Sequence, residues 1–86
     1  MKDPTIVREW LIIWFVKNAY LSRDEVDTRI DYLGKGWIDS LKFIELVSAI
    51  EGHFGIAFSN DEFQNRTFAT IDGLTRIIAG KLHGEE

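Results

Sequence analysis

The sequence of 86 residues contains no cysteine, a single proline and one methionine. Without cysteine the chain has no disulfide, no thiolate nucleophile and no thiolate metal site. Its two histidines, His53 and His83, lack the partners and spacing of a zinc site. The longest apolar run, Trp10 to Val16, is far shorter than the roughly 20 residues of a membrane-spanning helix. We therefore expect no bound metal and no membrane insertion.

The chain also lacks an excess of basic residues, because it has 10 lysines and arginines and 14 acidic residues, which gives a net charge of -4. Nucleic-acid binding needs basic surface, so we expect no nucleic-acid partner, whereas proteins with basic patches remain suitable partners. The start, Met1 to Pro4, carries an acid and a proline and is unlike a signal peptide. The length fits one domain. We predict a single soluble domain, residues 1–86, cytoplasmic and monomeric.

The first apolar segment predicts a helix from Thr5 to about Asn18. Asp3 can cap it, and Pro4 suits the first helical position because its missing N–H costs nothing there. Apolar side chains surround nearly the whole circumference, and a buried strand would also explain this composition. The cap and the length favour the helix. Such a helix packs on more than one side or offers an apolar patch to a partner.

A long connection from Asn18 to Asp39 follows. The segment Ser22 to Glu25 has the spacing of a capping box and predicts one short turn. Residues 34–36, Gly-Lys-Gly, form a flexible break. We expect four apolar residues to anchor this connection to the core: Val26, Ile30, Tyr32 and Leu33.

The central helix is predicted to run from Ser40 to about Phe54 and to end at Gly55. At about 100° per residue, its core face comprises Phe43, Leu46, Val47, Ile50 and Phe54. The opposite face holds Leu41, Glu45, Ser48 and Gly52, with Ile44 at the border. This exposed stripe suits a docking surface, although Leu41 packed beneath the preceding loop is an open alternative.

The remaining chain predicts a short helical segment and a last helix. Ser59 or Asn60 caps a short segment of residues 61–65, and the spacing of Ser59 and Glu62 is that of a capping box. Phe63 and Phe68 should dock this segment. Thr70 caps a helix from Ile71 to about Leu82, with an apolar stripe of Ile71, Leu74, Ile77, Ile78 and Leu82. Lys81 and His83 suit its negative end, and Gly84 ends the pattern. The fold class is therefore all-α: a small four-helix bundle with three main helices, one short helix and a long first loop.

Asp39 and Ser40 open the central helix. Asp39 is a good N-cap, and the Ser40 hydroxyl lies at the positive pole of the helix, where a phosphate bonded to it would be stabilised. Asp-Ser is a common dipeptide, and taken alone most such pairs mark a helix start and nothing more. A hydrolase using Ser40 would need a histidine beside the hydroxyl, and His53 falls on a flank of the helix away from it. We therefore predict that the chain is not an enzyme.

Motifs along the whole chain carry a family resemblance: Leu33-Gly34 ahead of Asp39-Ser40-Leu41, Ile44-Glu45-Leu46-Val47, Glu51, Phe54-Gly55-Ile56, Asp61-Glu62 and Thr70-Ile71. In this order they resemble the acyl carrier protein family. The resemblance implies that Ser40 carries covalent 4′-phosphopantetheine, with Asp39 as the helix cap beside it. It also implies an acyl group held as a thioester, a phosphopantetheinyl transferase as partner, and enzymes that load and transfer the acyl group.

Further roles follow from the same resemblance. Leu41, Ile44, Glu45 and Ser48 are the expected partner-binding residues. Trp37 either contacts the arm or its cargo, or anchors the long loop in the core. A small apolar gap between helices is expected to shelter the acyl chain.

The chain also departs from the fatty-acid carriers. Lys42, Gly52 and His53 stand where acids are frequent in that group. Trp37-Ile38 and residues 65–68 look more like stand-alone carriers of dedicated pathways, such as D-alanyl carriers. Fatty-acid, lipid and polyketide-type biosynthesis and aminoacyl or peptidyl cargo all remain open. The alternative from another class is an unmodified helical interaction domain that binds through its first helix and the Leu41 stripe.

Overall fold

The computed structural model describes residues 3–82, and these form helices joined by loops without a named strand. The main helices are α1 (Pro4–Asn18), α2 (Ser40–Phe54) and α4 (Ile71–Leu82), with a short α3 (Asn60–Phe63). Two 3₁₀ turns, η1 (Arg23–Glu25) and η2 (Arg66–Ala69), complete the architecture. The predicted all-α bundle is confirmed, and η2 is an addition to it. The expected roles of His83 and Gly84 lie outside the described residues.

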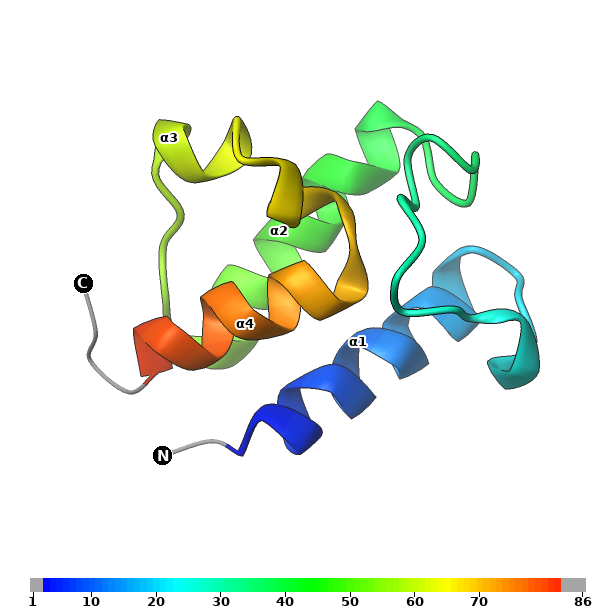
Figure 1. The fold of residues 1–86 in the computed structure, drawn as a ribbon, viewed down its shortest axis with the longest axis horizontal. Coiled ribbons are helices and arrows are strands. Elements are labelled where there is room, and N and C mark those ends of the chain that lie inside the picture. The colour runs from blue at the N-terminus through cyan, green and yellow to red at the C-terminus, as the bar shows by residue number, and fades with distance from the viewer. Residues whose placement is uncertain (1–2, 83–86) are drawn as a thin grey trace.

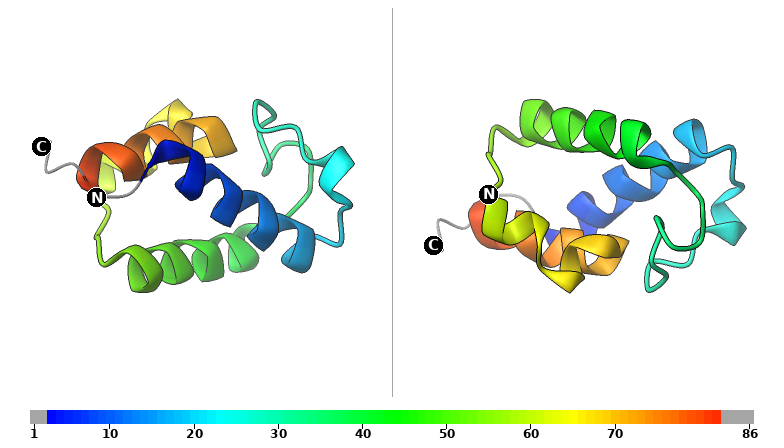
Figure 2. Two further views of the ribbon diagram at one scale, coloured as in Figure 1. Left: turned by 90° about the horizontal axis from the view of Figure 1, so that it is seen from below. Right: turned by 90° about the horizontal axis from the view of Figure 1, so that it is seen from above.

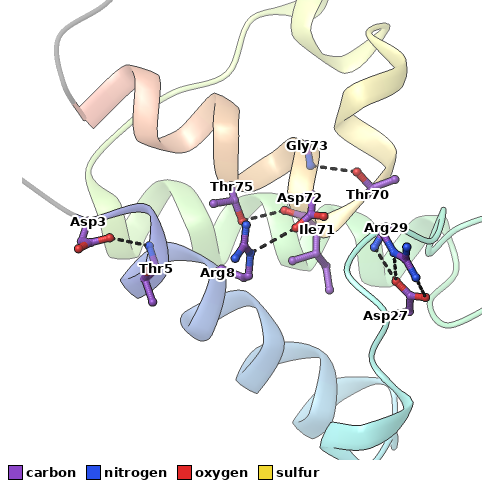
Figure 3. Close-up of polar contacts among 10 residues, drawn as sticks. All are labelled: Asp3, Thr5, Arg8, Asp27, Arg29, Thr70, Ile71, Asp72, Gly73 and Thr75. Carbon is purple, nitrogen blue, oxygen red and sulfur yellow. Dashed lines mark hydrogen bonds and ion pairs between the residues drawn. The ribbon is translucent and has the colours of Figure 1, made fainter.

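Helix α1 begins as its sequence predicts. The Asp3 carboxylate accepts a hydrogen bond from the Thr5 N–H at 2.8 Å, and Pro4 is the first helical residue (Figure 3). The alternative of a buried strand is therefore wrong. The helix buries Val7, Leu11, Ile12 and Phe15, but it leaves Ile6 and Ile13 about half exposed. Part of its apolar circumference thus faces solvent. No helix within residues 3–82 combines the length and apolarity needed to cross a bilayer.

The three main helices surround one core. α1 packs against α4, and α2 forms a separate side of the bundle that faces both (Figures 1 and 2). The α2 chain begins at the end of the bundle where the long loop lies, at the right of Figure 1, and runs back towards the end of α4. Buried residues from all three helices, the loop and η2 form the core: Val7, Leu11, Phe15, Tyr32, Ile38, Leu46, Ile50, Phe54, Phe68, Ile71, Leu74 and Ile78. The predicted core face of α2 is confirmed, with Phe43 and Val47 packed at its edge.

The long connection is tied to the segment before α4. Tyr32 is fully buried, its N–H donates to the Ala69 carbonyl at 3.1 Å, and its hydroxyl donates to the Phe68 carbonyl. Of the other predicted anchors, Val26 packs against the core and Ile30 is partly buried. Leu33 is 38% exposed, so its prediction as an anchor is wrong.

The reason lies in a tight turn that the sequence pattern did not reveal. The Asp31 carboxylate accepts hydrogen bonds from the N–H groups of Leu33 and Gly34, and this turn leaves Leu33 on the surface. The same turn brings the backbone back so that the Trp37 N–H donates to the Tyr32 carbonyl at 3.0 Å. The loop is therefore ordered up to the start of α2.

The capping box before α3 is confirmed in both directions: the Ser59 hydroxyl accepts from the Glu62 N–H, and the Glu62 carboxylate accepts from the Ser59 N–H. Phe68 is 2% exposed and docks the segment as predicted, whereas Phe63 is 40% exposed and docks only in part. Lys81 lies in the last turn of α4, where it forms an ion pair with Glu62 at 3.0 Å. This pair ties α4 to α3.

Candidate functional site

The start of α2 has the cap that its sequence predicts. Asp39 is extended, with φ -97° and ψ -178°, and its carboxylate accepts a hydrogen bond from the Lys42 N–H at 2.8 Å. Ser40 is therefore the first helical residue, and it is exposed. The cap sets the point where the helix begins, and the serine hydroxyl lies exposed at this end of the helix.

The surroundings of Ser40 fit a covalently attached phosphate. The first N–H groups of a helix have no partner within it, and they give this end a partial positive charge. The Asp39 carboxylate is turned back onto the Lys42 N–H. A phosphodiester on the exposed hydroxyl would therefore meet backbone N–H groups at the helix start, which is a favourable place for an anion. The residues present thus suit the arm that the resemblance implies.

The residues before the cap hold the loop against the core. Gly36 has φ 81°, a conformation that glycine adopts readily. Trp37 is half-buried, and its ring lies against Phe15 with centroids 6.1 Å apart. Of the two expectations for Trp37, the anchoring role is therefore met, while contact with an arm or cargo stays a prediction.

Ile38 is a core residue that sequence reasoning missed, since it is only 6% exposed. A signal for it was available. An apolar residue directly before the N-cap often packs against the fourth helical residue, which here is Phe43. Ile38, directly before the Asp39 cap, is therefore a second core anchor of this segment beside Trp37.

The outer face of α2 is apolar near Ser40. Leu41 and Ile44 are 68% and 63% exposed, so the alternative that Leu41 packs beneath the loop is wrong. Glu45 and Ser48 are also exposed on this helix. The four predicted partner-binding residues are thus accessible on α2, and their role stays a prediction.

The charges on this face are largely compensated. Glu45 accepts from the Lys42 ammonium at 3.1 Å. The Glu51 carboxylate accepts from the Phe58 N–H at 3.0 Å in a partly buried position, so it serves the turn after α2. The face beside Ser40 therefore offers apolar side chains more than negative charge.

Two small hollows lie between α2 and the segment containing α3 and η2. The larger measures about 240 Å³ and is lined by Phe43, Ile44, Val47, Ser48, Glu51 and Phe63. The smaller measures about 120 Å³ and is lined by Leu33, Phe43, Phe63, Asn65, Phe68 and Ala69. Sequence reasoning predicts an apolar gap between helices but does not identify Phe63 as part of its wall.

The geometry does not form a catalytic pair. His53 is thirteen residues beyond Ser40 on the same helix, which is about 20 Å along the axis. Its imidazole stacks on Trp10 with ring centroids 5.0 Å apart. A hydrolase based on Ser40 and His53 is therefore excluded. Within residues 3–82, no group of three or more His, Asp or Glu side chains is arranged to hold a metal ion.

An exposed serine at the capped start of the second main helix, in a bundle of this helix order, is the arrangement that the resemblance to carrier proteins predicts. A family model described as "phosphopantetheine attachment site" matches residues 15–78. The chain therefore belongs to the phosphopantetheine-binding carrier family, whose members carry covalent 4′-phosphopantetheine and are not themselves catalytic. Comparisons with curated proteins and with solved structures gave no match. The predicted resemblance to carrier proteins is confirmed, and the matched segment includes the whole of α2.

Proposed function

We propose that Ser40 is the attachment residue and that the chain is an acyl carrier protein. The observation that carries this proposal is the exposed Ser40 hydroxyl at the first position of α2, beside the Asp39 cap and inside the matched family segment. Serines elsewhere in the chain lack this combination: Ser22 and Ser59 are themselves N-caps, and Ser48 lies in the middle of α2.

The bound group supplies a terminal thiol, a function that the cysteine-free chain lacks, and this thiol holds an acyl group as a thioester. On modification, the Ser40 oxygen forms the new P–O bond, loses its proton, and the nucleotide half of coenzyme A leaves. We assign the base for this step to the transferase, because the Asp39 Oδ1 is bonded to the Lys42 N–H and His53 is remote. Tethering at Ser40 then raises the effective concentration of the cargo at each partner enzyme.

The partners are a phosphopantetheinyl transferase and the enzymes that load and transfer the acyl group. Leu41, Ile44, Glu45 and Ser48 form the docking face, and its contacts are mainly apolar because Lys42 pairs with Glu45. This balance supports a stand-alone carrier of a dedicated pathway, and we propose that the chain works as a cytoplasmic monomer. Fatty-acid, lipid or polyketide-type biosynthesis is the proposed setting, and a D-alanyl or peptidyl carrier is the alternative.

The test is intact-protein mass spectrometry after incubation with coenzyme A and a promiscuous phosphopantetheinyl transferase. We expect the wild type to gain the mass of one phosphopantetheine and Ser40→Ala to gain none. Ser22→Ala is the matched control, since it removes an exposed hydroxyl outside the docking face and should be modified like the wild type. Modification of Ser40→Ala would move the attachment site elsewhere.

A second candidate function is an unmodified interaction domain. The exposed Leu41 and Ile44 on α2, together with Ile6 and Ile13 on α1, are the observation that favours it. This function predicts that several transferases fail to modify the folded wild type. It also predicts that Ser40→Ala binds its partner with wild-type affinity, whereas Leu41→Ala does not.

A further inference from the structure

Helix α1 carries an apolar strip on the side that faces away from the core. Ile6 and Ile13 in this strip are 55% and 46% exposed. They are seven residues apart, so at about 100° per residue they lie within about 20° of each other around the helix. The buried side of α1, which packs against the bundle, lies opposite and comprises Val7, Leu11 and Phe15. Because α1 forms one edge of the bundle (Figure 1), the strip remains at the surface.

Two opposite charges flank Ile13 at equal distances along the helix. Glu9 is four residues before it and Lys17 is four residues after it, each about 6 Å away along the axis. Lys17 is exposed, and within residues 3–82 it has no ion pair. The Glu9 side chain is 45% exposed, and Arg23 Nη2 donates to its Oε2, which leaves the second carboxylate oxygen for another partner. The strip therefore carries one charge of each sign, placed symmetrically about Ile13.

This arrangement of charges is complementary to itself. When a second copy of α1 lies antiparallel with Ile13 opposite Ile13, Glu9 of each copy comes to the level of Lys17 of the other. In a parallel pair, each of these two residues would instead meet its own copy. Opposite charges favour an interface and like charges select against it. Since a two-fold interface uses the same patch on both copies, this strip supplies both halves of an antiparallel contact.

We propose that the outer face of α1 binds a second copy of this chain, antiparallel and with Ile13 at the two-fold axis. The strip from Ile6 to Lys17 is only about 16 Å long, so the contact is smaller than the roughly 1,200 Å² of a stable interface. The dimer is therefore reversible, and the monomer prevails in dilute solution. This inference does not depend on the attachment of a group at Ser40.

The first test uses the absence of cysteine, because a single engineered cysteine then gives an unambiguous cross-link. Ile13→Cys places its thiol at the proposed axis. The two thiols of Ile6→Cys would be about 21 Å apart in the antiparallel pair, too far for a disulfide. The variants are incubated with oxidised glutathione, and dimers are followed by non-reducing gel electrophoresis. We expect Ile13→Cys to cross-link at least about tenfold faster than Ile6→Cys.

The matched control for this test is Lys35→Cys, at an exposed position on the long loop. It reports the rate at which thiols meet by random collision, and Ile6→Cys should react at this rate. Fast cross-linking of both isoleucine variants would overturn the antiparallel arrangement, since only a parallel pair brings both positions next to their own copies. If both variants react only as fast as the control, the second copy is the wrong occupant and this face is left for another protein.

The second test measures dimerisation of the intact chain by sedimentation equilibrium up to millimolar concentration. Glu9→Lys turns both attractive pairs into repulsive ones, so it should weaken dimerisation about tenfold. Lys17→Glu should have the same effect. Both changes in one chain exchange the two charges, and an antiparallel pair then becomes attractive again. We therefore expect the double variant to dimerise within about threefold of the wild type.

The control for the charge variants is Arg23→Gln, because Glu9→Lys also removes the ion pair with Arg23. This control breaks the same internal pair but leaves the strip unchanged, so it should dimerise at least as tightly as the wild type. A double variant as weak as the single variants would overturn the pairing of Glu9 with Lys17. A tenfold loss in Arg23→Gln would assign the effect of Glu9→Lys to the internal ion pair.

Discussion

The starts of α2 and α4 have the same kind of side-chain cap, but the first helical residue is exposed in one and buried in the other. Asp39 and Thr70 are both extended, and each side chain accepts a hydrogen bond from the third helical N–H, at 2.8 Å from Lys42 and 2.9 Å from Gly73 (Figure 3 shows the second). The first helical residue then differs. Ser40 is exposed on α2, whereas Ile71 at the same position of α4 is fully buried.

The difference comes from what packs on each helix start. At α4 the long loop covers the N-terminus: the Asp72 N–H donates to the Thr28 carbonyl at 2.9 Å, and Asp31 pairs with Thr70 in a β-bridge. Arg8 of α1 also holds the Asp72 carboxylate at 3.2 Å (Figure 3). At α2 the loop packs Ile38 into the core beneath the cap and leaves the first helical turn exposed to solvent. A capping motif thus marks a helix start, and only the surrounding packing decides whether that start is a site.

The largest expected effect on the free energy of unfolding tests how closely the start of α4 is packed. A Cβ at Gly73 would lie 1.6 Å from the Thr67 carbonyl oxygen, so the backbone of η2 must move. We expect Gly73→Ala to lower the free energy of unfolding by about 3 kcal/mol or more in urea denaturation. Gly52 on α2 is the matched control, since a Cβ added there would meet no other atom within 4 Å.

Gly52→Ala should raise the free energy of unfolding by about 1 kcal/mol through helix propensity alone. Opposite signs for the same substitution on the two helices are the expected result. Equal effects would mean that the start of α4 is no more closely packed than the surface of α2.

The next effect concerns Tyr32, which fastens the loop to the segment before α4. Tyr32→Phe removes the donor to the Phe68 carbonyl and leaves that buried acceptor unpaired. We expect a loss of about 1–3 kcal/mol in the free energy of unfolding. The loop that contains Tyr32 leads directly into the exposed start of α2, so the amide signals of Trp37 and Asp39 should also shift in NMR spectra. An unchanged stability would show that the loop closes α4 without this bond.

The same residue gives a pH dependence whose sign can be derived. Burial, and then the charge of Asp31, raise the pKa of Tyr32 above its usual value of 10.0. The unfolded chain therefore loses this proton from about pH 10 while the folded chain keeps it, and stability falls as pH rises further, by up to about 1.4 kcal/mol per pH unit. Tyr32→Phe should flatten this fall. Tyr20→Phe, at a side chain that is 92% exposed, should leave it unchanged.

A smaller effect compares the two caps directly. Asp39→Ala should cost about 1 kcal/mol of stability through loss of the cap, and Thr70→Ala somewhat more because Thr70 is partly buried. Asp39→Asn should recover most of the loss, since asparagine caps equally well. Urea denaturation at neutral pH measures all three. A large loss in Asp39→Asn would assign the carboxylate a role beyond capping.

The sequence was sufficient for the features that depend on local chemistry. Caps, capping boxes and the apolar phase of α2 and α4 follow from residue type and spacing, so the capping roles of Asp3, Asp39, Ser59 and Thr70 are predicted correctly. The exposed Ser40 follows from its position after a cap, combined with the family resemblance. The chemistry at a helix start is therefore readable from sequence, since it involves only neighbouring residues.

Features that depend on distant packing are not readable in the same way. The apolar character of Leu33 predicts a place in the core, but the Asp31 turn holds it outside. The close approach of Thr67 to Gly73 joins η2 to α4, and no local pattern distinguishes Gly73 from Gly52. The closed start of α4 and the open start of α2 can be told apart only once the loop has been placed.

The smallest effect on stability is expected at the residue that matters most for the proposed function. Ser40→Ala removes an exposed hydroxyl that is not the cap, and alanine is the better helix former. We therefore expect the free energy of unfolding to change by less than about 0.5 kcal/mol. A loss above about 1 kcal/mol would assign Ser40 a structural role and remove the contrast with α4. An unchanged fold that no longer accepts phosphopantetheine would show that the open helix start serves chemistry rather than stability.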